Sequence, residues 1–470
     1  MAQPLALHPD NPHYFLHNGQ VTVLITSAEH YGAVSNLDFD YLAYLEALAA
    51  DRLNHTRLFI ASYVEPPGAF KIQNNSLCPA AGRLIAPWAR STRVGYAGGG
   101  AKFDLMRWDP AYFVRLRDFI AKAARHDIIV EVTFFSTMYN DATWQMSPMH
   151  PDNNINGVGM GVSFNDVYQA WANAGLRDVQ DALAGKVITE LKDCDNIYYE
   201  IINEPYIGDD KIAWQNRMIN SIVVPAQAAL DDRHLLSVNV ANGDAVVTAG
   251  NGLDSNISIY NFHYSNPRAV RDNYGLSRAI GDNETNAHGP LDATYRREAW
   301  AFILGGGAIF SNVDWSFTVD HEDGTYVYDA QTPGGGGAAL RAQLGVLKEF
   351  IHGFDLVKMH PQRTILSNYQ SNASAEALIA SGKQYALYLK DAEAPQVTKG
   401  PVGIDLPAGN YRAQWIDVLT GEVVHSRSIA ATGGVRPLKN LTGLSEYAVK
   451  IVETALPQSQ TLSRHKPRHP

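Results

Sequence analysis

The chain has 470 residues, of which 46% are hydrophobic and 18% charged, so a globular protein with one large and one smaller domain is expected. The net charge of −10 argues against a nucleic-acid partner or an anionic membrane surface, and no run of about 20 apolar residues predicts a membrane span. The two cysteines, Cys78 and Cys194, favour free buried thiols over a disulfide framework. No signal peptide pattern is visible at the N-terminus, which leaves the compartment open.

Eight apolar runs occur in residues 1–355, and helical patterns separate most of them. The runs are continuous rather than alternating, which is typical of parallel strands buried on both faces. They cover residues 21–27, 55–62, 127–137, 196–205, 234–242, 257–265, 277–285 and 307–315. This order predicts an α/β fold, a (β/α)8 TIM barrel, and residues 11–20 predict a hairpin that closes its bottom.

Helical patterns cover about residues 37–53, 109–127, 165–193, 211–231, 292–304 and 337–353. Asp38 is the predicted N-cap of the first helix. Asp109 followed by Pro110 predicts the start of the second, because proline is favoured at the first helical position. The crossover after the fifth strand is short and only weakly helical.

The pattern changes after the barrel. Residues 356–455 contain short alternating strands separated by glycine-rich turns, which predict a C-terminal all-β sandwich domain. The last segment, 456–470, is polar and basic and is predicted to be disordered.

Polar side chains mark the predicted C-terminal ends of the barrel strands, where a barrel of this kind carries its active site. Glu204 ends the fourth strand in "YYEIINEPY", and Glu284 ends the seventh in "GDNET". A protonated and an ionised carboxyl that face one another are what glycoside hydrolysis requires. We expect the other strand-end residues to contact the substrate: His30, Arg57, Tyr139, Asn203, His263, Tyr264 and Trp315.

These residues, in this order, resemble those of clan A glycoside hydrolases, with the cellulase-like family 5 nearest in pattern. The resemblance rests on Asn-Glu-Pro at 203–205, His-Tyr at 263–264, Glu284 and Trp315, and spans roughly residues 10–350. It implies a retaining double displacement with Glu284 as nucleophile and Glu204 as acid/base. A separation of about 5 Å between the two carboxyl groups is then expected.

The resemblance also implies roles for the neighbouring residues. Asn203 is implied to bind the sugar 2-hydroxyl and Arg57 to hold the nucleophile. His263 and Tyr264 are implied to orient substrate and nucleophile, and Trp315 to form the platform beneath the sugar at the cleavage point. Each of three residues also has a purely structural interpretation. Arg57 would form a buried ion pair, His263 would be a hydrogen-bonded core histidine, and Trp315 would pack at the barrel rim.

The segments after the second and third strands are long and aromatic. Their side chains either form sugar-stacking subsites or pack their own loops: Trp88, Tyr96, Trp108, Tyr139 and Trp144.

A carbohydrate is the expected partner, and this chemistry requires no cofactor and no metal. A non-catalytic carbohydrate-binding barrel is the alternative, and a different hydrolase on the same fold lacks the support of a G-x-S-x-G motif. The sequence leaves open the sugar, endo or exo action, the role of the β-domain and the oligomeric state.

Overall fold

The chain divides into two compact units in the computed structural model: Met1–Met359 with Leu419–Gly421, and His360–Val418 with Glu422–Pro470. The structure describes residues 3–169, 173–207, 211–329, 332–368, 375–390, 402–439, 441 and 444–454. The tail predicted to be disordered, 456–470, lies outside these residues.

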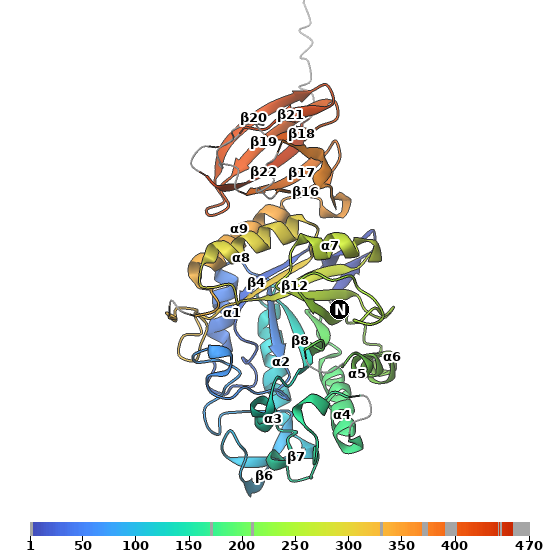
Figure 1. The fold of residues 1–470 in the computed structure, drawn as a ribbon, viewed down its shortest axis with the longest axis vertical. Helices are drawn as coiled ribbons and strands as arrows, with labels where there is room; N and C mark the ends of the chain where they lie inside the picture. Colours follow the sequence, from blue (N-terminus) through green and yellow to red (C-terminus); the bar gives the residue numbers. More distant parts are fainter. Residues whose placement is uncertain are drawn as a thin grey trace, which may run out of the picture. The chain divides into compact units, whose positions relative to one another are not determined.

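The first unit is a barrel of parallel strands surrounded by helices, which confirms the predicted (β/α)8 fold (Figure 1). Each observed strand overlaps a predicted run. Along the sheet the order is β4, β13, β12, β11, β10, β9, β8 and β5, and every paired neighbour is parallel. The strands are β4 (Leu24–Ala28), β5 (His55–Phe59), β8 (Ile129–Ser136), β9 (Ile197–Asn203), β10 (Leu236–Asn242), β11 (Ile259–His263), β12 (Ala279–Thr285) and β13 (Ile309–Val313).

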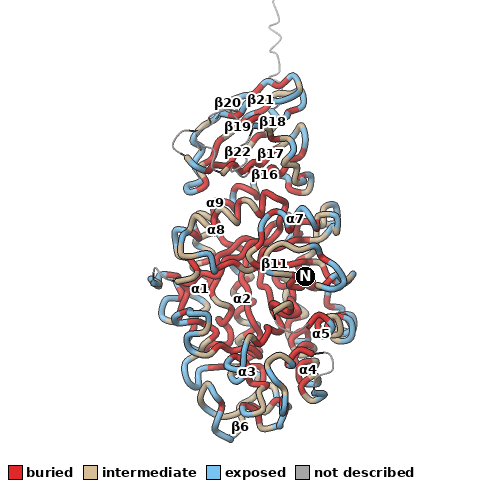
Figure 2. The backbone as a smooth tube through the Cα atoms, viewed as in Figure 1, coloured by how far each residue is buried: buried red, intermediate tan, exposed pale blue. Residues whose placement is uncertain are grey.

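Strands β4 and β5 form no regular ladder, and Asn54, the residue before β5, links the two through both its side chain and its backbone. The Asn54 side chain accepts a hydrogen bond from the Ile25 amide at 2.9 Å, and the Asn54 amide donates to the Ile25 carbonyl at 3.3 Å. Figure 2 shows the barrel strands as buried and the loops around them as increasingly exposed.

Most helices follow the predicted patterns, but α4 begins at Ala174 rather than near residue 165, and one cap is corrected. Asp109 caps α2 with Pro110 in the first turn, as predicted. Asp40, not Asp38, caps α1, because the Asp38 carboxylate accepts from Arg83 instead, at 2.6 Å. The helices are α1 (Tyr41–Ala50), α2 (Pro110–Ala124), α3 (Asp141–Met146), α4 (Ala174–Leu191), α5 (Ile212–Arg217), a π-helical turn (Met218–Val223), α6 (Val224–Leu230), α7 (Pro267–Asn273), α8 (Asp292–Leu304) and α9 (Ala338–His352). No helix in the described part of the chain is long and apolar enough to cross a membrane.

A small antiparallel sheet closes the bottom of the barrel, as predicted. It consists of β1 (Ala6–His8), β2 (Asn11–His17) and β3 (Gln20–Thr22). Phe15 and Leu5 pack in one cluster with residues that begin barrel strands, such as Leu24 and Ile309. At the opposite end, β6 (Trp88–Val94) and β7 (Ala101–Trp108) form a hairpin inserted between β5 and α2.

The second unit is a β-sandwich, as predicted. A larger antiparallel sheet has the order β14 (His360–Pro361), β16 (Ala375–Ala380), β17 (Gln384–Lys390), β22 (Glu446–Glu453), β19 (Gly409–Ile416) and β20 (Val423–Ala431). A smaller sheet has the order β15 (Leu366–Ser367), β18 (Gly403–Asp405) and β21 (Val435–Pro437). Trp415 and Leu387 of the larger sheet share one core with Leu366 and Ile404 of the smaller.

Candidate active site

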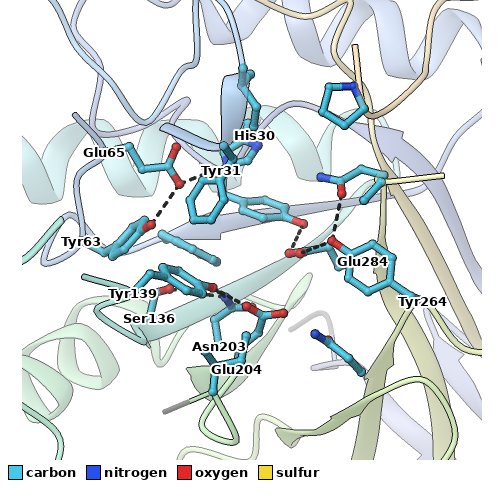
Figure 3. A pocket seen from close by; sticks show the side chains of 18 of the residues that line it. His30, Tyr31, Tyr63, Glu65, Ser136, Tyr139, Asn203, Glu204, Tyr264 and Glu284 are labelled. Carbon is cyan, nitrogen blue, oxygen red and sulfur yellow. Dashed lines mark hydrogen bonds and ion pairs between the residues drawn. The ribbon is translucent and has the colours of Figure 1, made fainter. Parts of the chain in front are cut away.

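A pocket of about 500 Å³ lies at the C-terminal ends of the barrel strands (Figure 3). Glu204, directly after β9, and Glu284, near the end of β12, both line it. Two further candidates, Arg57 and His263, are fully buried and contact these glutamates from beneath. The other sequence-predicted residues that line the pocket are His30, Tyr139, Asn203, Tyr264 and Trp315.

Glu284 accepts hydrogen bonds from three side chains. The Tyr31 hydroxyl donates to Oε2 at 2.8 Å and the Arg57 guanidinium to the same oxygen at 3.2 Å. The Tyr264 hydroxyl donates to Oε1 at 3.4 Å. Charge-assisted donors of this kind orient an ionised carboxylate, which can only accept.

Glu204 has a different environment. The Tyr139 hydroxyl donates to Oε2 at 2.5 Å, and Nδ1 of His263 lies 3.0 Å from Oε1. The backbone is in the left-handed region, with φ of 51°, a conformation that costs of order 1 kcal/mol or more in a non-glycine residue. Two hydrogen bonds of the Glu204 backbone stabilise it: the Thr137 hydroxyl donates to the carbonyl at 2.7 Å, and the amide donates to the Asn239 side-chain oxygen at 3.1 Å. This local strain directs the carboxylate into the pocket (Figure 3).

His263 joins the two glutamates. Its Nδ1 lies 3.0 Å from a Glu204 oxygen and 3.5 Å from a Glu284 oxygen. Burial lowers the pKa of His263, but the charge of Glu284 and the hydrogen bond and charge of Glu204 outweigh burial and leave the pKa raised. Burial has the opposite effect on Glu204 and raises its pKa. The contacts with His263 and Tyr139 outweigh burial and leave the pKa of Glu204 below its ordinary value. The opposite directions of these shifts, with 3.0 Å between the two groups, favour a shared proton that rests on His263 rather than on Glu204.

The two carboxylates are close together. One oxygen of each and a nitrogen of His263 lie within 4.8 Å of one another. Among the described residues, this is the one His, Cys, Asp and Glu group with a spacing that could hold a metal ion. Each carboxylate already accepts from a tyrosine, and Arg57 supplies a cation at Glu284, so protein donors already offset much of the negative charge of the group.

Asn203 is oriented from both sides. Its side-chain oxygen accepts from Arg57 at 2.8 Å, and its amide nitrogen donates to the Tyr139 hydroxyl at 2.9 Å. Trp315 is buried against the glycine-rich segment after β13, where a Cβ on Gly334 would lie 2.7 Å from the indole nitrogen.

One wall of the pocket joins the predicted His30 to residues that the sequence did not single out. His30 Nε2 lies 3.3 Å from Glu65, and the Tyr63 hydroxyl donates to the same oxygen at 3.0 Å. Asn75 donates to the other oxygen. Tyr63 and Glu65 closely follow the predicted second strand in "SYVEPP", a position that could have identified them. Tyr31 closely follows the first strand in the same way, but its contact with Glu284 joins residues 253 positions apart.

Most aromatic residues of the long inserts do not line the pocket. Trp88 stacks on Trp108 with ring centroids 6.5 Å apart, Tyr96 packs on Phe103, and the Trp144 indole donates to the Val162 carbonyl. Tyr139 is the exception among the five candidates. The other four therefore pack their own loops.

Comparisons with known proteins identify the fold. No family model matches the chain, and no curated protein matches it in sequence. One similar solved structure is described as a glycoside hydrolase, with a TM-score of 0.62 and 13% identity, over 96% of this chain and 97% of that one. Another is a glycoside hydrolase family 5 structure from Bacteroides vulgatus ATCC 8482, with a TM-score of 0.64 and 12% identity, over 96% of this chain and 93% of that one. Both matches extend into the β-sandwich unit, and the chain thus has the fold of clan A glycoside hydrolases, as the sequence resemblance implied.

Proposed function

We propose that this protein is a retaining β-glycosidase, with Glu284 as the nucleophile and Glu204 as the acid/base. The observation that carries the proposal is the separation of the two carboxylates. One oxygen of Glu204 and one of Glu284 lie within 4.8 Å of one another, and both side chains line the same pocket. Retaining enzymes separate the pair by roughly 5–5.5 Å, whereas inverting enzymes leave roughly 6.5–9.5 Å for a water molecule.

The first step breaks the glycosidic bond. A Glu284 oxygen attacks the anomeric carbon while Glu204 donates a proton to the departing oxygen. Because Nδ1 of His263 lies 3.0 Å from Glu204, the shared proton can move onto the carboxylate as the leaving group develops charge. Tyr31 and Arg57 keep the other nucleophile oxygen in place.

The second step restores the enzyme. Glu204, now ionised, takes a proton from water, and the resulting hydroxide-like oxygen attacks the anomeric carbon of the glycosyl ester. Glu284 departs as a carboxylate, and the sugar leaves with the configuration it had in the substrate. Tyr139 donates to Glu204 while the glutamate is ionised.

The pocket suits a sugar ring. The Trp315 side chain offers an apolar surface for the ring carbons, and Asn203 offers an amide to hydroxyl groups. Glu65 and His30 supply further polar atoms on another wall.

The test is a screen of aryl β-glycosides and β-linked oligosaccharides, with proton NMR of the first product formed. The β-anomer is expected first, and Glu204→Gln and Glu284→Gln should each abolish most of the activity. An α-anomer as first product would refute the retaining mechanism. Binding of a sugar without cleavage, unchanged in both variants, would instead support the non-catalytic alternative.

A further inference from the structure

Below the proposed catalytic centre, the barrel interior contains two more glutamates. Glu131 on β8 and Glu200 on β9 are fully buried, as is Arg57 on β5. Arg57 donates to Glu200 and lies 3.8 Å from Glu131, while its other end donates to Glu284. One guanidinium is therefore shared among three carboxyl groups.

The charges facing this pair do not balance if every carboxyl is ionised. His55, 3.7 Å from Glu131, adds no charge, because burial lowers its pKa to about 3. Tyr198, which donates to Glu131 at 2.9 Å, is also neutral, because burial raises its pKa. Side-chain amides supply the facing groups on β10, β11 and β12: Asn239, Asn261 and Asn283. Because unpaired ions are very costly in a buried site, one carboxyl should be protonated.

The hydrogen bonds indicate which carboxyl is ionised. Glu200 accepts from Arg57 and Thr133 on one oxygen and from three asparagine amides on the other, at 3.1–3.4 Å. Glu131 also accepts from Asn261 and Asn283, at 3.1 and 2.9 Å, so the cation and not the amides distinguishes the two carboxyls: Arg57 donates to Glu200. Glu131 makes no direct hydrogen bond to Arg57, and burial and then the charge of Glu200 raise its pKa well above the ordinary value. Oε1 of Glu131 and Oε1 of Glu200 accept from the same Asn261 and Asn283 amides, which places the two carboxyl groups next to one another.

We propose that Glu131 and Glu200 form a buried acid–carboxylate pair, in which Glu131 carries the proton and Glu200 positions the Arg57 guanidinium on the nucleophile. The positioning role rests on the proposed function of Glu284. The placement of the proton does not. In this arrangement Glu200 fixes one end of Arg57 and leaves the other end directed at the Oε2 atom of Glu284.

Two isosteric variants in the same barrel interior test the proposal. Glu131→Gln replaces a neutral acid by a neutral amide of the same shape, which keeps an acceptor oxygen and a donor group, with two N–H bonds in place of one O–H, so kcat/KM should stay within about threefold of wild type. Glu200→Gln removes the negative charge and directs amide protons at existing donors. The kcat should fall about 10- to 100-fold with little change in KM, as expected when a charge-assisted hydrogen bond is lost.

The pH profile separates positioning from general instability. Glu200→Gln should move the acid limb of kcat/KM to lower pH, because a negative charge near Glu284 is lost, whereas Glu131→Gln should leave that limb in place. Equal loss of kcat in the two variants, or an acid limb that moves in Glu131→Gln, would overturn the proposal. Thermal unfolding of each variant identifies losses that come from misfolding.

Infrared difference spectroscopy tests the proton directly. At neutral pH, Glu131→Gln should lose one protonated-carboxyl carbonyl band relative to wild type, and an unchanged band intensity would overturn the assignment. This measurement remains decisive if Glu200→Gln does not fold. If the wild-type protein cleaves no glycoside, the proposed function fails, while the infrared result still decides where the proton resides.

Discussion

Removal of the Tyr139 hydroxyl should shift the pH dependence of the proposed activity. The hydroxyl donates to Glu204 Oε2 at 2.5 Å and accepts from Asn203. Tyr139→Phe keeps the ring, and the Asn203 amide retains a long contact with Ser136 at 3.4 Å. The substitution therefore removes mainly one donor to the acid/base.

The size of the shift follows from that hydrogen bond. A hydrogen bond to a charged group contributes about 1.5–3 kcal/mol, which corresponds to roughly one to two pKa units. Tyr139 is one of the groups that hold the pKa of Glu204 below its ordinary value, against burial. Because Glu204 shares its proton with His263, we expect an observed rise of about one unit.

The assay is the pH dependence of kcat/KM on an aryl β-glycoside, whose basic limb reports loss of the acid's proton. The limb should move to higher pH in Tyr139→Phe. Tyr63→Phe is the matched control: its ring lies 6.0 Å from that of Tyr139, but its hydroxyl donates to Glu65. A limb that stays in place or moves lower in Tyr139→Phe, or moves equally in the control, would refute the reasoning.

Three further predictions concern the nucleophile's donors, the buried ion pair and pH-dependent stability. Tyr31→Phe should lower kcat/KM more than Tyr264→Phe, because the Tyr31 hydroxyl lies 2.8 Å from Glu284 and the Tyr264 hydroxyl 3.4 Å. Steady-state kinetics measures the two losses, and a larger loss in Tyr264→Phe would contradict the prediction. Arg57→Met should lower the free energy of unfolding in urea by about 3–5 kcal/mol, since it leaves Glu200 buried without its cation, and an unchanged midpoint would argue against that pairing. Burial raises the pKa of Glu29 from 4.5 to about 7, although Ser76 and backbone amides oppose it. The folded state then favours the protonated form of Glu29, so the free energy of unfolding should fall by up to about 3 kcal/mol as the pH rises from 4.5 to about 7. In Glu29→Gln, the melting temperature should depend less on pH over the same range.

Much of the fold follows from local patterns. Continuous apolar runs separated by helical segments predict buried parallel strands, and the structure contains all eight. Glu204 and Glu284 could be identified because each carboxylate ends such a run. The cap of α1 shows the limit of local reasoning: Asp38 and Asp40 are both suitable residues, and the tertiary contact of Arg83 with Asp38 leaves Asp40 as the cap.

The rest of the site depends on contacts between distant residues. Glu200 is a charge inside the apolar run "YYEII", but the partner that makes its burial possible, Arg57, lies 143 positions away. Which strand-end side chains touch Glu284 likewise depends on the closed barrel, since Tyr31 and Tyr264 lie 264 − 31 = 233 positions apart in the sequence. Strand order and register, which a single sequence does not contain, determine these contacts.

The role of Glu284 as a covalent nucleophile is the central claim, and trapping the glycosyl-enzyme tests it most directly. A 2-deoxy-2-fluoro analogue of the best aryl glycoside, with a good leaving group, should slow the second step more than the first and accumulate the intermediate. Mass spectrometry of the digested protein should then place one sugar on Glu284. A sugar on Glu204, or rapid turnover of normal substrate with no labelled glutamate, would contradict the account.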